Sequence, residues 1–174
     1  MAEASAAALE ARSAADDQKE RCLAAIADGL PAAVDRLARR AAQAEPDTAR
    51  RLGPSGVRDL KNDLSVRSTE LAADIRSAAG RIGWPENGLV AAKDVHGALF
   101  KHLYGARLEP IARVLKDHGL LRSEGAVLPQ DLYDEMSFDP LADALSAQSR
   151  ADAALAQARK ADDLRAVDDL WDNA

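Results

Sequence analysis

Alanine content is the feature that most constrains the fold of this chain, since 39 of its 174 residues are alanine while aromatic residues make up only 3%. Alanine has the highest intrinsic helix propensity, and the β-branched and aromatic residues that favour strands are sparse. Because a methyl group fills little volume, alanine-rich helices bury their surfaces by approaching one another closely. The sequence therefore predicts an all-α fold, a bundle of five or six helices whose alanine-rich terminal helices can extend beyond it.

The clearest helical pattern lies in the middle of the chain, between Ser55 and Gly83. Apolar residues recur there at alternating spacings of three and four, which is typical of an amphipathic helix. They are Val57, Leu60, Leu64, Leu71, Ile75, Ala78 and Ile82. We expect Ser55 to cap the start of this helix and Gly83 to end it in a left-handed conformation, with Pro85 preventing its continuation. Arg67 and Ser68 interrupt the stripe, so a packed bundle helix is favoured over a sustained coiled coil.

Proline and glycine mark the ends of other predicted elements. Residues 1–44 form an alanine-rich helical domain with a break or kink at Pro31, and the turn residues Glu45-Pro46-Asp47 end it. The segment Trp84-Pro85-Glu86-Asn87-Gly88 combines a proline with an Asn-Gly pair that tolerates positive φ. His118-Gly119 is expected to stop a further helix.

The central domain comprises residues 45–138 and includes more than the apolar stripe. Two helices are expected after the stripe, one over about 89–104 and one over about 108–116, because Gly105 permits a turn between them. At most one short hairpin is expected, near residues 120–128.

The acidic C-terminal domain, residues 139–174, is predicted to be one long helix. Asp139 is placed to cap its start, and Pro140 occupies the first helical position, where its missing N–H costs nothing. Its apolar stripe is weak in the middle, where residues 146–161 are nearly all alanine, charged or amide. We therefore expect that this helix can project as a single helix.

Several features favour a soluble cytoplasmic protein. Cys22 is the only cysteine, so no intramolecular disulfide forms and a reducing compartment is expected. Residues 1–8 carry Glu3 where a secretory signal would carry basic residues. No apolar run approaches the roughly 20 residues that span a bilayer, so no membrane association is expected.

The residues that carry chemistry in other proteins form no catalytic, cofactor or metal constellation here. His96 and His102 are six residues apart, whereas metal ligands on a helix lie three or four apart, and His118 is expected at a helix C-terminus. Cys22 lies within a helix and lacks an activating neighbour. The paired carboxylates lie on solvated helices that give no reason for the shifted pKa of an acid–base catalyst. They are Asp16-Asp17, Asp134-Glu135, Asp162-Asp163 and Asp168-Asp169. We therefore expect no catalytic residues, cofactor or metal, and a protein that is not an enzyme.

Charge is distributed unevenly along the chain, although the net charge is only −6. Residues 36–82 carry ten Lys/Arg and six Asp/Glu, whereas residues 123–174 carry four Lys/Arg and twelve Asp/Glu. Such polarity allows the acidic tail to lie on the basic middle, within one chain or between chains, and also provides a basic surface for an acidic partner. Segregated solvated helix faces are the simpler interpretation.

One segment, residues 107–128, resembles the recognition helix and wing of winged helix-turn-helix regulators. A short helix there ends in the sequence Gly-Leu-Leu before the possible hairpin. The resemblance implies that Arg107, Arg113 and Lys116 would face DNA and that Arg122 on the wing would contact phosphate. A DNA-binding transcriptional regulator is therefore the alternative functional hypothesis.

The C-terminal residues 162–174 combine apolar anchors with five aspartates. The anchors Leu164, Val167, Leu170 and Trp171 have the spacing of a helix that binds in a partner's groove. Packing of Trp171 against its own chain, closing the bundle, is the other interpretation. The main functional hypothesis is a non-enzymatic helical adaptor or regulatory protein that acts through protein–protein interaction and oligomerises, its partner being another protein or a second copy of itself.

Overall fold

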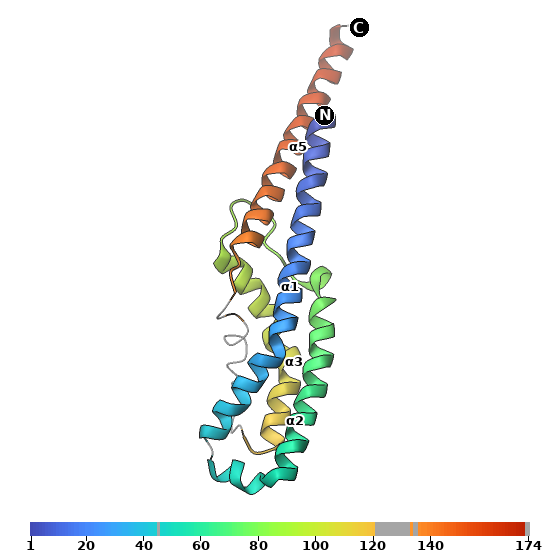
Figure 1. The fold of residues 1–174 in the computed structure, drawn as a ribbon. Coiled ribbons are helices and arrows are strands. Elements are labelled where there is room, and N and C mark those ends of the chain that lie inside the picture. The colour runs from blue at the N-terminus through green and yellow to red at the C-terminus, as the bar shows by residue number, and fades with distance from the viewer. Residues whose placement is uncertain (45, 121–132, 134–135, 173–174) are drawn as a thin grey trace. The chain divides into compact units, whose positions relative to one another are not determined.

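The computed structural model describes residues 1–44, 46–120, 133 and 136–172, with side chains for all of these except 104–108 and 168–172. Its elements are α1 (Ala2–Ala44), α2 (Pro46–Arg76), the 3₁₀-helix η1 (Ala79–Arg81), α3 (Ala92–Asp117) and α5 (Asp139–Asp172) (Figure 1). The described residues contain no strand, so the all-α prediction is confirmed. The hairpin expected near residues 120–128 falls almost entirely outside the described residues.

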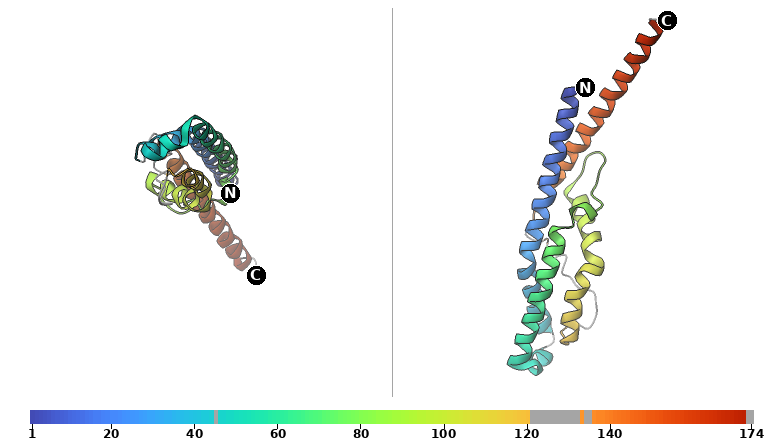
Figure 2. Two further views of the ribbon diagram at one scale, coloured as in Figure 1. Left: turned by 90° about the horizontal axis from the view of Figure 1, so that it is seen from below. Right: turned by 90° about the vertical axis from the view of Figure 1, so that its right-hand side faces the viewer.

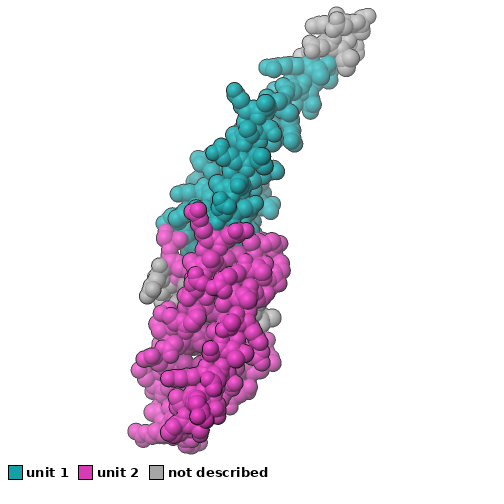
Figure 3. Space-filling view, turned by 45° about the vertical axis from the view of Figure 1, so that its right-hand side comes forward, with its two compact units in different colours: residues 1–19, 84–95, 138–174 teal, residues 20–83, 96–137 magenta. Residues whose placement is uncertain are grey.

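The chain divides into two compact units, coloured separately in Figure 3. Unit 1 comprises residues 1–19, 84–95 and 138–174, and unit 2 comprises residues 20–83 and 96–137. Both units combine segments that are distant in sequence, and each is described by itself below.

In unit 1, the N-terminal part of α1 and α5 lie side by side and run in opposite directions (Figures 1 and 2). An ion pair joins Arg12 to Asp152 across them, at 2.8 Å between Nη2 and Oδ1. Ala8 and Ala15 of α1 are 2% and 0% exposed. These two small side chains, seven residues or about two turns apart, mark the buried side of this helix and permit close packing.

Residues 84–91 of unit 1 include the predicted turn at residues 84–88, and two serines of α5 bind their backbone. The Gly88 N–H donates to Ser149 Oγ at 2.7 Å, and the Val90 N–H donates to Ser146 Oγ at 2.8 Å. Gly88 has a φ of 79°, which confirms the turn that the Asn-Gly pair predicted.

In unit 2, α1 continues through Pro31 to Ala44, so of the break or kink predicted at Pro31 the helix break is wrong. Ile26 and Leu30 before the proline are 0% exposed, and Val34 after it is 3% exposed. Because buried residues at helical spacing continue on both sides, packing offsets the backbone hydrogen bond that Pro31 removes. The predicted end of the helix before Pro46 is confirmed.

Helix α2 contains the predicted central stripe as far as Ile75, with three local differences. Its kink lies at Gly53, where φ is 63° and ψ is −179°, a conformation that only glycine adopts readily. Ser68, predicted to interrupt the stripe, is buried at 4% exposure, whereas Val57, predicted to lie in it, is 38% exposed. The helix ends at Arg76, and Gly83 does not adopt the predicted left-handed conformation.

Helix α3 runs without interruption from Ala92 to Asp117, so the predicted turn at Gly105 is wrong. A stripe of buried residues at multiples of four explains the continuity, because it extends across the glycine and outweighs a propensity cost of about 1 kcal/mol. Its members are Val95, Leu99, Leu103, Ile111 and Leu115, all 0% exposed.

The stop predicted at His118-Gly119 is confirmed in detail. Gly119 has a φ of 71°, its N–H donates to the Lys116 carbonyl at 2.8 Å, and the Leu120 N–H donates to the Leu115 carbonyl at 2.8 Å. These two bonds form a Schellman motif, which satisfies carbonyls at the end of α3.

Across the described part of the chain, no helix is both long enough and apolar enough to pass through a bilayer.

Candidate partner-binding surfaces

The C-terminal part of α5 presents two exposed apolar side chains. Leu164 is 57% exposed and Val167 is 48% exposed. Leu170 and Trp171, the other two predicted anchors, lie on the same helix, but their side chains are outside the described ones. Two large apolar side chains one helical turn apart form an apolar patch, which we call the α5 stripe.

The α5 stripe lies on the same face of α5 as Ser146 and Ser149, which bind residues 84–91. Leu164 lies 18 residues after Ser146, and Val167 lies 18 residues after Ser149, a separation of about five full turns. The two serines bind residues 84–91 through backbone N–H groups. The same side of α5 therefore contacts the chain's own turn near its start and presents leucine and valine near its end.

Burial along α5 falls with distance from its start. Leu141, Leu145 and Leu155 are 2%, 4% and 7% exposed, but none of the residues 156–167 is buried. The described side chains of this later stretch thus have little packing within the chain.

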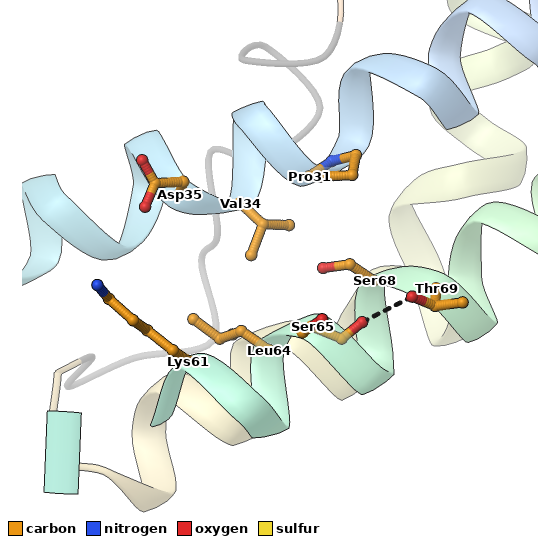
Figure 4. A pocket seen from close by; sticks show the side chains of 8 residues that line it. All are labelled: Pro31, Val34, Asp35, Lys61, Leu64, Ser65, Ser68 and Thr69. Atoms are coloured by element: carbon orange, nitrogen blue, oxygen red, sulfur yellow. Dashed lines mark hydrogen bonds between the residues drawn. The ribbon is translucent and has the colours of Figure 1, made fainter. Parts of the chain in front are cut away.

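A groove in unit 2 is the second candidate surface. It lies between α1 and α2 and has two lobes with volumes of about 200 and 320 Å³, which share Asp35, Lys61 and Leu64. Figure 4 shows the smaller lobe, with Lys61 extending from α2 toward α1. The residues that line the larger lobe are Asp35, Ala38, Arg39, Ala42, Ala49, Leu52, Val57, Leu60, Lys61, Leu64 and Leu120.

The larger lobe is apolar inside and charged at its edge. Ala38 and Ala42 of α1 and Ala49 of α2 leave space that larger side chains would fill. Leu60 and Leu64, both 7% exposed, also line the lobe. Arg39 Nε donates to Asp35 Oδ2 at 2.7 Å, which neutralises that carboxylate. Lys61 is the remaining charged residue of the lining, so the groove carries a net positive charge.

The groove was missed by the sequence analysis, although some signals for it are present. Val57 belongs to the helical stripe, yet it lies at the groove and is exposed. The kink at Gly53 divides α2 into the two stretches that line the larger lobe. The groove depends on contacts between α1 and α2, which no local pattern encodes.

The residues of the DNA-binding alternative lie at the end of α3 and beyond it. Arg113 is paired with Glu109 on the same helix. Lys116 is exposed in the last turn of α3, Arg107 lies on α3 with its side chain outside the described ones, and Arg122 lies outside the described residues. The helix carrying them is the C-terminal part of one long helix rather than a separate short helix.

His96 and His118 contact other side chains, and Cys22 is buried. The ring of His96 stacks on Phe100 at 6.1 Å and contacts Tyr133 edge-on at 4.8 Å, while His118 Nε2 lies 3.1 Å from Asp63 Oδ2. Burial raises the pKa of the Cys22 thiol to about 11, so the thiol is protonated at neutral pH. The described residues include no group of three or more potential metal ligands.

Comparison with known proteins finds no matching family model, no matching curated protein and no matching solved structure.

Proposed function

We propose that this protein is a non-enzymatic helical adaptor that binds a protein partner through the α5 stripe. The observation that carries the proposal is the exposure of Leu164 and Val167 on a helix whose earlier part is packed. Aliphatic residues exposed one turn apart at an acidic helix end are the elements of helix-in-groove recognition. A partner that covers them removes apolar surface from water, which is the main driving force of association.

The architecture supports this interpretation in a second way. The first half of α5 is fixed in unit 1 by the Arg12–Asp152 ion pair and by the bonds from Ser146 and Ser149 to residues 84–91. Because the start of α5 is anchored, its C-terminal part is already helical before a partner binds. Less conformational entropy is then lost on binding than when a disordered segment folds onto a partner.

Photo-crosslinking in the producing cell tests the proposal. A photoreactive amino acid is introduced at position 164 or 167, and at position 166 as a control, because Ala166 is exposed in the same turn on another side of the helix. We expect protein adducts from 164 and 167 above the level from 166, with the partner's crosslinked peptides identified by mass spectrometry.

Substitutions give the matching energetic test. Leu164→Asp and Val167→Asp should abolish the adducts and leave the free energy of unfolding unchanged within about 0.5 kcal/mol, since both side chains are exposed. Ala166→Asp, which adds the same charge, should change neither quantity. Trp171→Ala should weaken association by about 2 kcal/mol or more if it is an anchor. Two results together would contradict the proposal. They are a lower free energy of unfolding for Leu164→Asp and Val167→Asp, and adducts from positions 164 and 167 no stronger than those from position 166.

A further inference from the structure

The groove of unit 2 and the α5 stripe have complementary chemistry. Apart from three charged residues, the larger lobe is lined by alanine, leucine and valine, and Leu164 and Val167 of the α5 stripe are exposed apolar side chains. Residues 162–172 carry five aspartates and one arginine, a net charge of −4, whereas residues 36–82, which include most of the lobe's lining, carry a net charge of +4. An acidic amphipathic helix end matches an apolar groove in a basic surface.

Both surfaces are exposed in the single chain. In the groove Val57 is 38% exposed, and on α5 Leu164 is 57% exposed. Neither surface is therefore covered by the described part of the chain to which it belongs. Both surfaces are therefore open to a second copy of the protein.

We infer that the C-terminal turns of α5 from one copy bind in the α1–α2 groove of a second copy. This inference rests on the proposed function, because it names the partner of the α5 stripe. Leu164 and Val167 enter the larger lobe beside Val57, and Lys61 at its edge faces the aspartates of the incoming helix.

The size of the groove sets the strength of this contact. A lobe of about 320 Å³ is at the lower end of the range for binding pockets, so it holds a few side chains rather than a whole helix face. Small interfaces of this kind give transient complexes. Self-association should therefore be reversible, depend on protein concentration and weaken with added salt, because part of it is charge attraction.

Sedimentation equilibrium of the full chain over a range of concentrations tests the inference with two groove variants and a control. Val57→Glu and Lys61→Glu both place an acid in the groove, where the incoming aspartates repel it, and should weaken self-association about tenfold or more. Val66→Glu is the matched control, because Val66 is 55% exposed on the same helix and does not line the groove. It should associate like the wild-type protein.

Mixing two variants shows whether the contact is between copies. Asp163→Lys, in the acidic end of α5, should weaken self-association on its own, as Lys61→Glu does. An equimolar mixture of the two variants should associate more strongly than either alone, because the acidic groove of one then receives the basic helix end of the other. An intramolecular contact cannot produce this gain, so its absence overturns the inference, as does a Val57→Glu variant that associates like Val66→Glu.

The two proposals fail in different ways. A wild-type chain that stays monomeric at all concentrations, while position 164 still crosslinks to another protein, overturns self-docking and leaves the adaptor proposal standing. Self-association that is unaffected by Leu164→Asp, with no adducts at 164 or 167, overturns both.

Discussion

Ser146 lies on the buried side of α5, where its hydroxyl binds backbone groups of Val90 and Ala142. Its Oγ accepts a hydrogen bond from the Val90 N–H at 2.8 Å and lies 2.9 Å from the carbonyl of Ala142, to which it donates. Ser146→Ala leaves the Val90 N–H without this acceptor in a buried position, and we expect the free energy of unfolding to fall by about 1–3 kcal/mol. Denaturant titration followed by circular dichroism measures the change.

Ser149→Ala is the control for this prediction. Ser149 Oγ accepts from the Gly88 N–H in an exposed position, where water replaces the serine. We expect a change within about 0.5 kcal/mol. If Ser146→Ala and Ser149→Ala lowered the free energy of unfolding equally, burial of the hydrogen bond would not determine its contribution to stability.

Gly119 holds a conformation that other residues adopt only at a cost. Its φ is 71°, and a Cβ added to it would lie 3.0 Å from Thr48 Cγ2. Gly119→Ala should therefore lower the unfolding free energy by about 1–2 kcal/mol.

Gly29→Ala provides the opposite case, because Gly29 lies inside α1 with open space around it, and it should raise the unfolding free energy by about 0.5–1 kcal/mol. Thermal unfolding of both variants tests the pair, and a stabilised Gly119→Ala protein would contradict the assignment of the Schellman motif.

Six of the seven apolar residues of the predicted central stripe are buried, whereas Val57 at its end and Ser68 in its gap differ from the prediction. Ser68 is buried because it has the helical phase of Leu64 and Leu71 and is small enough to fit. Val57 has the correct phase but lies at the groove, so it is exposed. Periodicity gives the direction of a side chain, whereas burial also depends on what lies opposite, which is a nonlocal property.

At the scale of the element, helix type was predictable and continuity was not. Pro31 and Gly105 each predicted an interruption, yet α1 and α3 run through them. In both helices the buried stripe has the same phase before and after the interrupting residue, and packing of that stripe outweighs the local cost. Gly119 did stop its helix, because its left-handed conformation is accompanied by the two hydrogen bonds of the Schellman motif.

Pro31 should consequently be a residue that destabilises its own helix. It lies inside α1, where it lacks the N–H that would bond to the carbonyl of residue 27. Pro31→Ala should raise the unfolding free energy by about 1–3 kcal/mol, as measured by denaturant titration. Pro46→Ala is the control, because Pro46 is the first residue of α2 and gives up no helical bond, so its change should stay within about 0.5 kcal/mol. A less stable Pro31→Ala protein would mean that the packing of Leu30 and Val34 requires proline geometry.

At the scale of the whole molecule, the α5 stripe could be predicted and the groove could not. Leu164 and Val167 lie on one helix, so their spacing alone indicated a shared face. The groove combines α1 and α2 with Leu120 after α3, and its space depends on alanines from both α1 and α2. Surfaces formed within one element can be inferred from sequence, whereas surfaces formed between elements require the fold.

Amide hydrogen exchange, measured over a range of protein concentrations, tests the α5 stripe and the groove in the same experiment. In dilute protein, the amides of residues 156–172 should exchange faster than those of residues 141–155, because the described side chains after Leu155 lack burial. As concentration rises, protection should increase in residues 156–172 and in the groove stretches near Ala42 and Val57 together, since docking between copies covers both. Leu164→Asp should remove the concentration dependence from both regions, while Ala166→Asp should keep it. Strong protection of residues 156–172 at the lowest concentration would instead mean that the chain's own packing stabilises the end of α5, and protection that rises in only one of the two regions would separate the stripe from the groove.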